Sequence, residues 1–120
     1  MIIIREKPQP LVEMAQFKGF GIIVEIRSDD HGKFGNKESP AHAHVLDGSK
    51  REIAQIALMT NKCPEKPADI IWHRTPNPPV GLGDRIVKLF KSPSKAAKKA
   101  GLGGTVWQSA LHQWFVFHED

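Results

Sequence analysis

The chain has 120 residues, a mass of 13.4 kDa and a formal net charge of +4, which is the size of one domain with a single modest core. Its apolar fraction of 40% and charged fraction of 25% exclude collagen, a long coiled coil and wholesale disorder. A single cysteine excludes an intramolecular disulfide and a Cys-rich zinc module. No apolar run approaches the ~20 residues of a membrane span, and the N-terminus lacks the pattern of a signal peptide. We therefore expect a cytoplasmic protein with no membrane association.

The first sixty residues predict a small sheet. A β-branched and apolar run predicts a strand at 20–27, and polar residues predict a loop at 28–39. Residues 41–46 alternate with a period of two, as a second strand does. Residues 51–58 are ambiguous, because Asp47 and Gly48 signal a hairpin whereas Ser49 and Glu52 form a capping box before helical spacing. We predict a strand at 51–58, a further short strand at 2–4 and a weak helix or turn at 11–17.

The C-terminal third predicts helices. Residues 84–91 place apolar side chains on one face and basic side chains on another. Ser92 and Pro93 end this helix and begin the next, with Ser92 as its N-cap, and Gly101 is suited to its C-terminus. Thr105 can cap a third helix, whose apolar residues recur at helical spacing as far as Phe115. Proline-rich loops at 63–67 and 75–81 separate this region from the sheet.

The predicted fold is therefore α+β, a small antiparallel sheet covered by two or three C-terminal helices. We expect a single domain over residues 1–120. It has a mainly β part at 1–74, which carries a His-x-His strand, and a basic helical part at 82–118.

The positive charge is concentrated in one segment. Residues 84–104 hold six basic residues and one acidic residue, so the rest of the chain is nearly neutral. A concentrated cationic patch favours a polyanionic partner such as nucleic acid, or an acidic protein. The alternative is a solvated helix face that serves solubility alone.

Part of the same segment resembles a helix-turn-helix. Ala97 matches the small residue where two helices cross, Gly101 matches the turn glycine, and Leu102, Trp107 and Ala110 match the apolar positions of the second helix. The resemblance implies that the second helix faces a DNA groove and that lysines contact phosphate. Together, the basic segment and this resemblance assign the following residues to nucleic acid: Lys88, Lys91, Lys95, Lys98, Lys99, Thr105, Gln108, Ser109 and His112. A purely structural helix pair is the alternative.

The His-x-His strand is the second functional signal. His42 and His44 share one face of the predicted strand, and the small apolar residues on the opposite face predict a core there. Two imidazoles at this spacing can bind one metal ion, with a third ligand from elsewhere in the chain. The candidates for that ligand are Asp29, Asp30, His31, Asp47 and His73.

The pair could instead act as base and acid in phosphodiester cleavage, with Lys50 or Arg51 stabilising the transition state. Two known patterns are not met. Gly48 and Ser49 occupy the window where a cupin-like motif has an acid, and Leu46 stands where a histidine-triad hydrolase has its third histidine. A pair that only packs or hydrogen-bonds remains the alternative to both functions.

The segment from Ser39 to Val45 resembles the signature of a bacterial family of small proteins of unknown function. Those proteins carry a Pro-Pro-His-x-His-Val strand soon after an N-terminal strand, and Pro40, His42, His44 and Val45 match it. Ala41 replaces the second proline, and the C-terminal region here is longer and more basic. The resemblance implies an α+β fold and an association with toxin–antitoxin pairs.

We predict a small cytoplasmic binding protein rather than an enzyme. Its basic C-terminal helical region would contact nucleic acid or an acidic protein partner, and the resemblance implies a bacterial or phage toxin–antitoxin or defence-related module. Two alternatives stay open: a small metal-dependent or His-based hydrolase or nuclease centred on His42 and His44, and a protein–protein interaction module with no nucleic-acid role. No cofactor is predicted except a divalent metal at those histidines, and a homodimer is compatible with the sequence.

Overall fold

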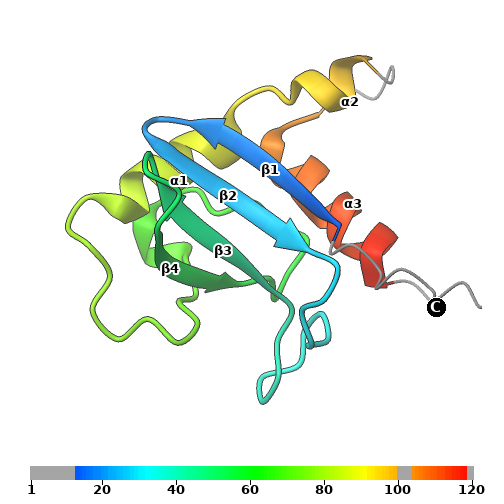
Figure 1. The fold of residues 1–120 in the computed structure, drawn as a ribbon, viewed down its shortest axis with the longest axis horizontal. Coiled ribbons are helices and arrows are strands. Elements are labelled where there is room, and N and C mark those ends of the chain that lie inside the picture. Colours follow the sequence, from blue (N-terminus) through cyan, green and yellow to red (C-terminus); the bar gives the residue numbers. More distant parts are fainter. Residues whose placement is uncertain (1–12, 100–103, 119–120) are drawn as a thin grey trace, which may run out of the picture.

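The computed structural model describes residues 13–99 and 104–118. Four antiparallel strands form one sheet in which each strand pairs with the next along the chain (Figure 1). The strands are β1 (Met14–Gly19), β2 (Ile22–Arg27), β3 (His42–Asp47) and β4 (Glu52–Ala57). The strands predicted at 20–27, 41–46 and 51–58 are therefore confirmed as β2, β3 and β4.

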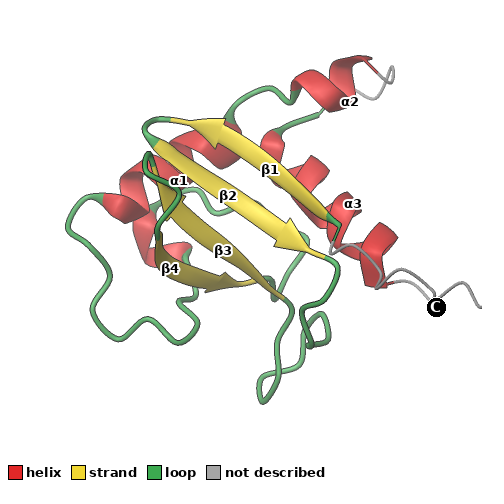
Figure 2. Ribbon diagram, viewed as in Figure 1, coloured by secondary structure: helices red, strands yellow, loops and turns green. Residues whose placement is uncertain are grey.

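The helices α1 (Leu82–Lys91) and α3 (Val106–His118) lie against one face of this sheet (Figure 2). A 3-10 turn, η1 (Pro67–Asp69), contacts α1, and the short helix α2 (Lys95–Lys99) projects beyond the sheet. The predicted α+β class, an antiparallel sheet covered by C-terminal helices, is confirmed. Among the described residues, no helix has both the length and the apolar character needed to cross a membrane.

The core forms where the helices meet the sheet. Ala43 and Val45 of β3 point into it and are fully buried, because alternate strand residues face the same side. From the helices, Phe90 of α1 and Trp107 of α3 meet edge to face with ring centroids 4.9 Å apart. The core side of β3 is therefore the side that small apolar residues predicted, and both histidines of the motif face the other side.

The prediction at 11–17 was wrong where the structure describes it, because residues 14–19 form β1. A two-residue turn, Phe20-Gly21, joins β1 to β2, and Gly19 stands opposite Ile22. Pairing along β2 stabilises β1 and overrides the weak helical preference of the segment, since propensity is a weak prior against tertiary contacts. The strand predicted at 2–4 lies outside the described residues.

The start of the second helix also differs from the prediction. Ser92 ends α1 in an extended conformation, and its N–H donates to Leu89, so it caps the C-terminus of one helix and not the N-terminus of the next. Ser94 precedes α2 and accepts the Lys98 N–H through its carbonyl. Pro93 pairs with Thr105 in an isolated β-bridge, which delays the start of α2 by two residues. The predicted C-terminus at Gly101 falls outside the described residues.

The predicted cap of the third helix is confirmed. Thr105 Oγ1 accepts the Gln108 N–H at 3.3 Å, and Gln108 Oε1 accepts the Thr105 N–H at 3.2 Å. This reciprocal pair is a capping box, which satisfies two amides that the first turn of a helix leaves unpaired.

Candidate functional site

A row of polar side chains crosses the sheet on the face opposite the helices. The strand register places Gln16 opposite Glu25, Glu25 opposite His44, and His44 opposite Gln55. Despite this position, Glu25 is 3% exposed and His44 is 5% exposed. Polar groups that are buried to this degree require partners, so this row is a candidate site and not a solvated surface.

The connection between β2 and β3 brings an acid to this row. The second half of this connection is closed on itself, because the Lys33 carbonyl accepts the Ala41 N–H and the Lys33 N–H donates to the Ser39 carbonyl. Gly32 has a φ of 152°, and a Cβ there would lie 2.3 Å from the Pro40 carbonyl oxygen. Glycine is therefore required for this closure.

Asp30, which lies in the same connection, meets both histidines of the motif. His44 Nε2 lies 2.9 Å from Asp30 Oδ2, and His42 Nε2 lies 3.5 Å from Asp30 Oδ1. One ligand atom from each of the three residues lies within 4.8 Å of the other two. Of the five residues that the sequence offered as a third ligand, Asp30 is the one that completes a convergent set.

The Nδ1 atom of each histidine faces an acceptor. His42 Nδ1 lies 3.1 Å from the Pro40 carbonyl oxygen, and His44 Nδ1 contacts the Glu52 carboxylate. When Nδ1 carries the proton and donates it to these acceptors, Nε2 is left as the basic nitrogen, directed at Asp30. Metal-binding histidines are commonly oriented by such a second hydrogen bond.

Glu52 reaches His44 because the β3–β4 ladder is irregular. A register shift between Val45 and Leu46 places Leu46 opposite Glu52. The shift brings Glu52 to the side of β4 that faces His44, whereas regular alternation from Gln55 would direct it to the core side. The capping-box interpretation of Glu52 did not indicate this role. An acid next to a predicted hairpin turn was the available signal, but its face depends on the register.

Electrostatics of the cluster favour charged forms in the absence of a metal. Burial raises the pKa of Asp30, but hydrogen bonds from His42 and His44 outweigh it and hold that pKa below its usual value. Burial lowers the pKa of His44, but the hydrogen bond and charge of Asp30, followed by the Glu52 hydrogen bond, raise it above the usual value. Asp30 and His44 therefore form an ion pair that connects the β2–β3 connection to the sheet.

A pocket of about 240 Å³ opens beside the cluster. The His73 ring stacks on His42 with centroids 4.7 Å apart, and Arg74 lies at the rim in a left-handed conformation with a φ of 49°. Burial, followed by electrostatic interactions with His42 and Arg74, lowers the pKa of His73. Gln55 Oε1 is buried and has no hydrogen-bond partner among the described residues. The pocket therefore offers a neutral imidazole, a cation and a free acceptor next to the ligand set.

The other candidates for the third ligand do not belong to the convergent set that Asp30, His42 and His44 form. Asp29 and His31 line the same pocket but are exposed. Asp47 Oδ1 accepts the N–H groups of Ser49 and Arg51 in the β3–β4 turn, so its carboxylate is engaged there. Lys50 and Arg51, the candidates for stabilising a transition state, are exposed in this turn.

The basic residues assigned to nucleic acid lie on α1 and α2. Their side chains are exposed, and none of them forms a salt bridge with another described residue; Lys91 donates to the Glu65 carbonyl at 2.9 Å. The residues in question are Lys88, Lys91, Lys95, Lys98 and Lys99.

The polar residues that the helix-turn-helix resemblance directs to a groove have different surroundings in α3. Thr105 and Gln108 form the capping box, and Ser109 Oγ donates to Ser94 Oγ at 2.7 Å. His112 is exposed. Only Gln108 and His112 of the four therefore present largely exposed side chains, and the Gln108 amide oxygen already has a partner.

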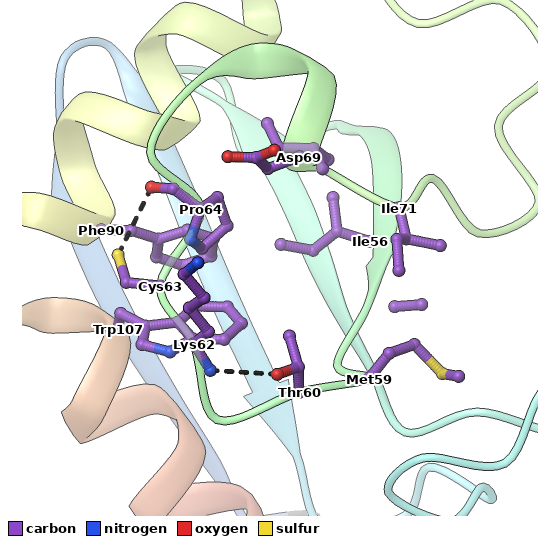
Figure 3. A pocket seen from close by; sticks show the side chains of 12 residues that line it. Ile56, Met59, Thr60, Lys62, Cys63, Pro64, Asp69, Ile71, Phe90 and Trp107 are labelled. Carbon is purple, nitrogen blue, oxygen red and sulfur yellow. Dashed lines mark hydrogen bonds between the residues drawn. The ribbon is translucent and has the colours of Figure 1, made fainter.

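A second cavity, of about 230 Å³, lies between β4, α1 and α3 (Figure 3). Cys63 faces it, with its Sγ 3.5 Å from the Pro64 carbonyl oxygen, and burial raises the pKa of this thiol. No histidine is among the described residues that line the cavity. A thiol with a raised pKa and no histidine among the described lining residues is a weak nucleophile.

Comparison with known proteins adds no family. The chain matches no family model, and no curated protein or solved structure matches it significantly.

Proposed function

We propose that this protein binds one divalent transition-metal ion through Asp30 Oδ, His42 Nε2 and His44 Nε2. The convergence of these three atoms, with an acceptor beside each Nδ1, carries the proposal. Two imidazoles and one carboxylate are a donor set typical of catalytic zinc and of non-haem iron. A small, non-disulfide-bonded protein with this site is expected in the cytoplasm.

The spacing of the donors supports a first-row metal ion. Ligands about 2.1 Å from a tetrahedral ion lie about 3.4 Å from one another. Asp30 Oδ1 lies 3.5 Å from His42 Nε2, close to this value, and 3.0 Å from His44 Nε2, which is somewhat shorter. Binding would replace the proton at His44 Nε2, and the attraction of Asp30 for that proton would pass to the ion.

Hydrolysis is the second candidate function, and the pocket favours it. Structural zinc sites are closed by four protein ligands, whereas catalytic sites keep a position open. Here three ligands come from the described residues and the pocket lies beside them, lined by His73, Arg74 and Gln55. A metal ion at such a site acts as a Lewis acid and lowers the pKa of water. A phosphate ester that contacts Arg74 is the substrate class that this environment suits.

The test compares two neighbouring substitutions with the same charge change. Asp30→Asn removes a ligand, whereas Asp29→Asn alters an exposed acid of the same pocket. We expect wild type and Asp29→Asn to bind one equivalent of Zn²⁺ in calorimetry, and Asp30→Asn to bind at least tenfold more weakly. Circular dichroism checks that both variants fold. Equal Zn²⁺ affinity in the two variants, or no stoichiometric binding by wild type, would show that the cluster is only a structural ion pair.

The hydrolytic candidate has its own measurement. Turnover of bis-(p-nitrophenyl) phosphate by the Zn²⁺- or Mn²⁺-loaded protein should fall in Asp30→Asn and also in Arg74→Ala, which retains the three ligands. Metal binding without turnover would leave the metal proposal intact and reject hydrolysis of this ester class.

A further inference from the structure

A groove at the other end of β2 has a different chemistry from the histidine cluster. Its volume is about 520 Å³, and it lies between the β1–β2 hairpin and the segment that joins α1 to α2. Phe17, Phe20 and Leu89 supply apolar surface, while Lys18 and Lys95 supply positive charge. No acidic residue is among the described residues that line it.

Phe20 has an unfavourable backbone conformation for a bulky residue in the β1–β2 turn. The Phe20-Gly21 turn has positive φ at both residues, 53° and 77°. Asn-Gly is the sequence that such a two-residue turn favours, whereas a bulky side chain is strained in the left-handed region. Phe20 is nevertheless 50% exposed, so the strain is not offset by full burial in the core. A strained and exposed aromatic residue beside a groove indicates a functional role.

The positive charge extends beyond the groove. Lys88 on α1, and Lys98 and Lys99 on α2, are exposed and form no salt bridge with another described residue. The segment that forms one wall of the groove is therefore also the most basic part of the chain. Besides Lys18 and Lys95 in the groove, this part of the chain therefore offers further exposed cations to a polyanionic ligand.

We propose that this groove binds single-stranded nucleic acid, with a base stacked on Phe20 and phosphates near Lys18 and Lys95. Exposed aromatic rings together with a basic groove are the two elements by which proteins bind single strands without sequence preference. An acidic peptide would use the lysines but gives no reason for an aromatic ring at a strained turn position. The groove and the Asp30 cluster lie at opposite ends of β2, so this proposal is independent of the metal site.

The experiment measures binding of fluorescein-labelled dT10 and U10 by anisotropy at several salt concentrations. Phe20→Asn is the decisive variant, because it replaces the aromatic ring with the residue that the turn favours. We expect its thermal unfolding midpoint to rise and its affinity for both oligonucleotides to fall about tenfold. A loss of binding in a more stable protein cannot be explained by misfolding.

The second part of the binding experiment reverses the charge of single lysines. Lys95→Glu should weaken binding and reduce the dependence of affinity on salt. Lys37→Glu makes the same change in the exposed β2–β3 connection, away from the groove, and should have a much smaller effect. Asp30→Asn should bind the oligonucleotides as wild type does, which separates this proposal from the metal site.

Four outcomes would overturn the proposal. The first is that wild type does not bind the oligonucleotides at low salt, and the second is that Phe20→Asn binds them with unchanged affinity. The third is that Lys37→Glu and Lys95→Glu weaken binding equally. The fourth is that a ten-residue poly-glutamate peptide or a ten-base-pair duplex binds more tightly than dT10. The last outcome would instead identify an acidic protein or double-stranded DNA as the occupant. A preference between dT10 and U10 would assign the groove to DNA or to RNA.

Discussion

His42 and His44 are the same residue type in the same strand, yet their surroundings give them different roles. His42 faces a backbone carbonyl, and its ring is covered by His73. His44 lies between two carboxylates, those of Asp30 and Glu52. A carboxylate next to Nδ1 increases the basicity of the imidazole more than a carbonyl does, so His44 is expected to be the stronger of the two ligands.

Replacing Glu52 should weaken metal binding without removing a ligand. Glu52→Ala leaves His44 Nδ1 without its acceptor, and loss of such an orienting group typically reduces metal affinity about 10- to 100-fold. Glu52→Gln keeps an acceptor oxygen, so its metal affinity should lie between that of Glu52→Ala and that of wild type. Competition with a chromogenic zinc chelator measures the effect, and Glu38→Gln, an exposed acid of the same pocket, is the control. Wild-type affinity in Glu52→Ala would reject the orienting role.

Asp47 should contribute a pH-dependent part of the stability through the β3–β4 turn. The backbone hydrogen bonds from Arg51 and then from Ser49 lower the pKa of this carboxyl. Its folded pKa lies below the unfolded value of about 3.9, so the stabilisation is present above that pH and is lost as the pH falls through the folded pKa. Denaturant unfolding of Asp47→Asn between pH 6 and pH 2 should show a shallower decline than wild type. Parallel declines would contradict this assignment.

Among the elements, the β2–β3 connection contributes more to the site than any strand except β3. It carries Asp30, and the contacts between Lys33 and Pro40 fold it back onto the sheet. Phe34 packs against Phe115 of α3 with ring centroids 5.3 Å apart, which anchors the tip of the connection to a helix. Chain closure, and not local secondary structure, therefore positions the third ligand.

Substitution of Gly32 should reduce metal affinity although Gly32 contacts no metal ligand. In Gly32→Ala the new Cβ would lie 2.3 Å from the Pro40 carbonyl oxygen, so the connection must open. We expect Zn²⁺ affinity to fall at least tenfold while far-UV circular dichroism stays close to that of wild type. Gly35→Ala is a matched control, because a Cβ at Gly35 meets nothing within 4 Å, although its φ of 79° adds some strain. Similar losses in both variants would indicate general flexibility of the connection.

Across the molecule, the two ends of the sheet carry sites of different chemistry. The Asp30 cluster lies where β2 ends, and the basic groove lies where β2 begins. The core links the cluster to α3, because Trp114 approaches His42 with ring centroids 6.4 Å apart and stacks on His118 at 3.7 Å. His118 in turn contacts the Arg27 carbonyl oxygen at 3.0 Å.

Metal binding should therefore stabilise the whole fold. A ligand at 100 times its dissociation constant adds about 2.7 kcal/mol to the free energy of unfolding when it binds only the folded state. Zn²⁺ should raise the thermal midpoint of wild type, and a chelator should reverse the rise. Asp30→Asn, the control, should show a clearly smaller rise, because it binds Zn²⁺ more weakly. A midpoint that Zn²⁺ leaves unchanged in wild type would contradict binding at this site.

The fold was more predictable than the site. Alternation at 41–46 and helical spacing at 84–91 are local patterns, and both elements form where they were expected. The strand at 14–19 was missed because an edge strand is stabilised by its neighbour and not by its own composition. Of the site, the sequence identified His42 and His44 and offered Asp30 among five candidates, but it did not indicate Glu52 as a partner.

By itself, the sequence determined that two imidazoles share one face of a strand, because successive strand residues alternate sides whatever the rest of the chain does. It also determined that the positive charge is concentrated near α1 and α2. Only the tertiary structure decided which acid joins the histidines and which carboxylate orients them. The position of Asp30 depends on how the chain folds back between Asp30 and His42, which are twelve residues apart. The position of Glu52 depends on the one-residue register shift between β3 and β4. Both are set by long-range packing, which no local periodicity encodes.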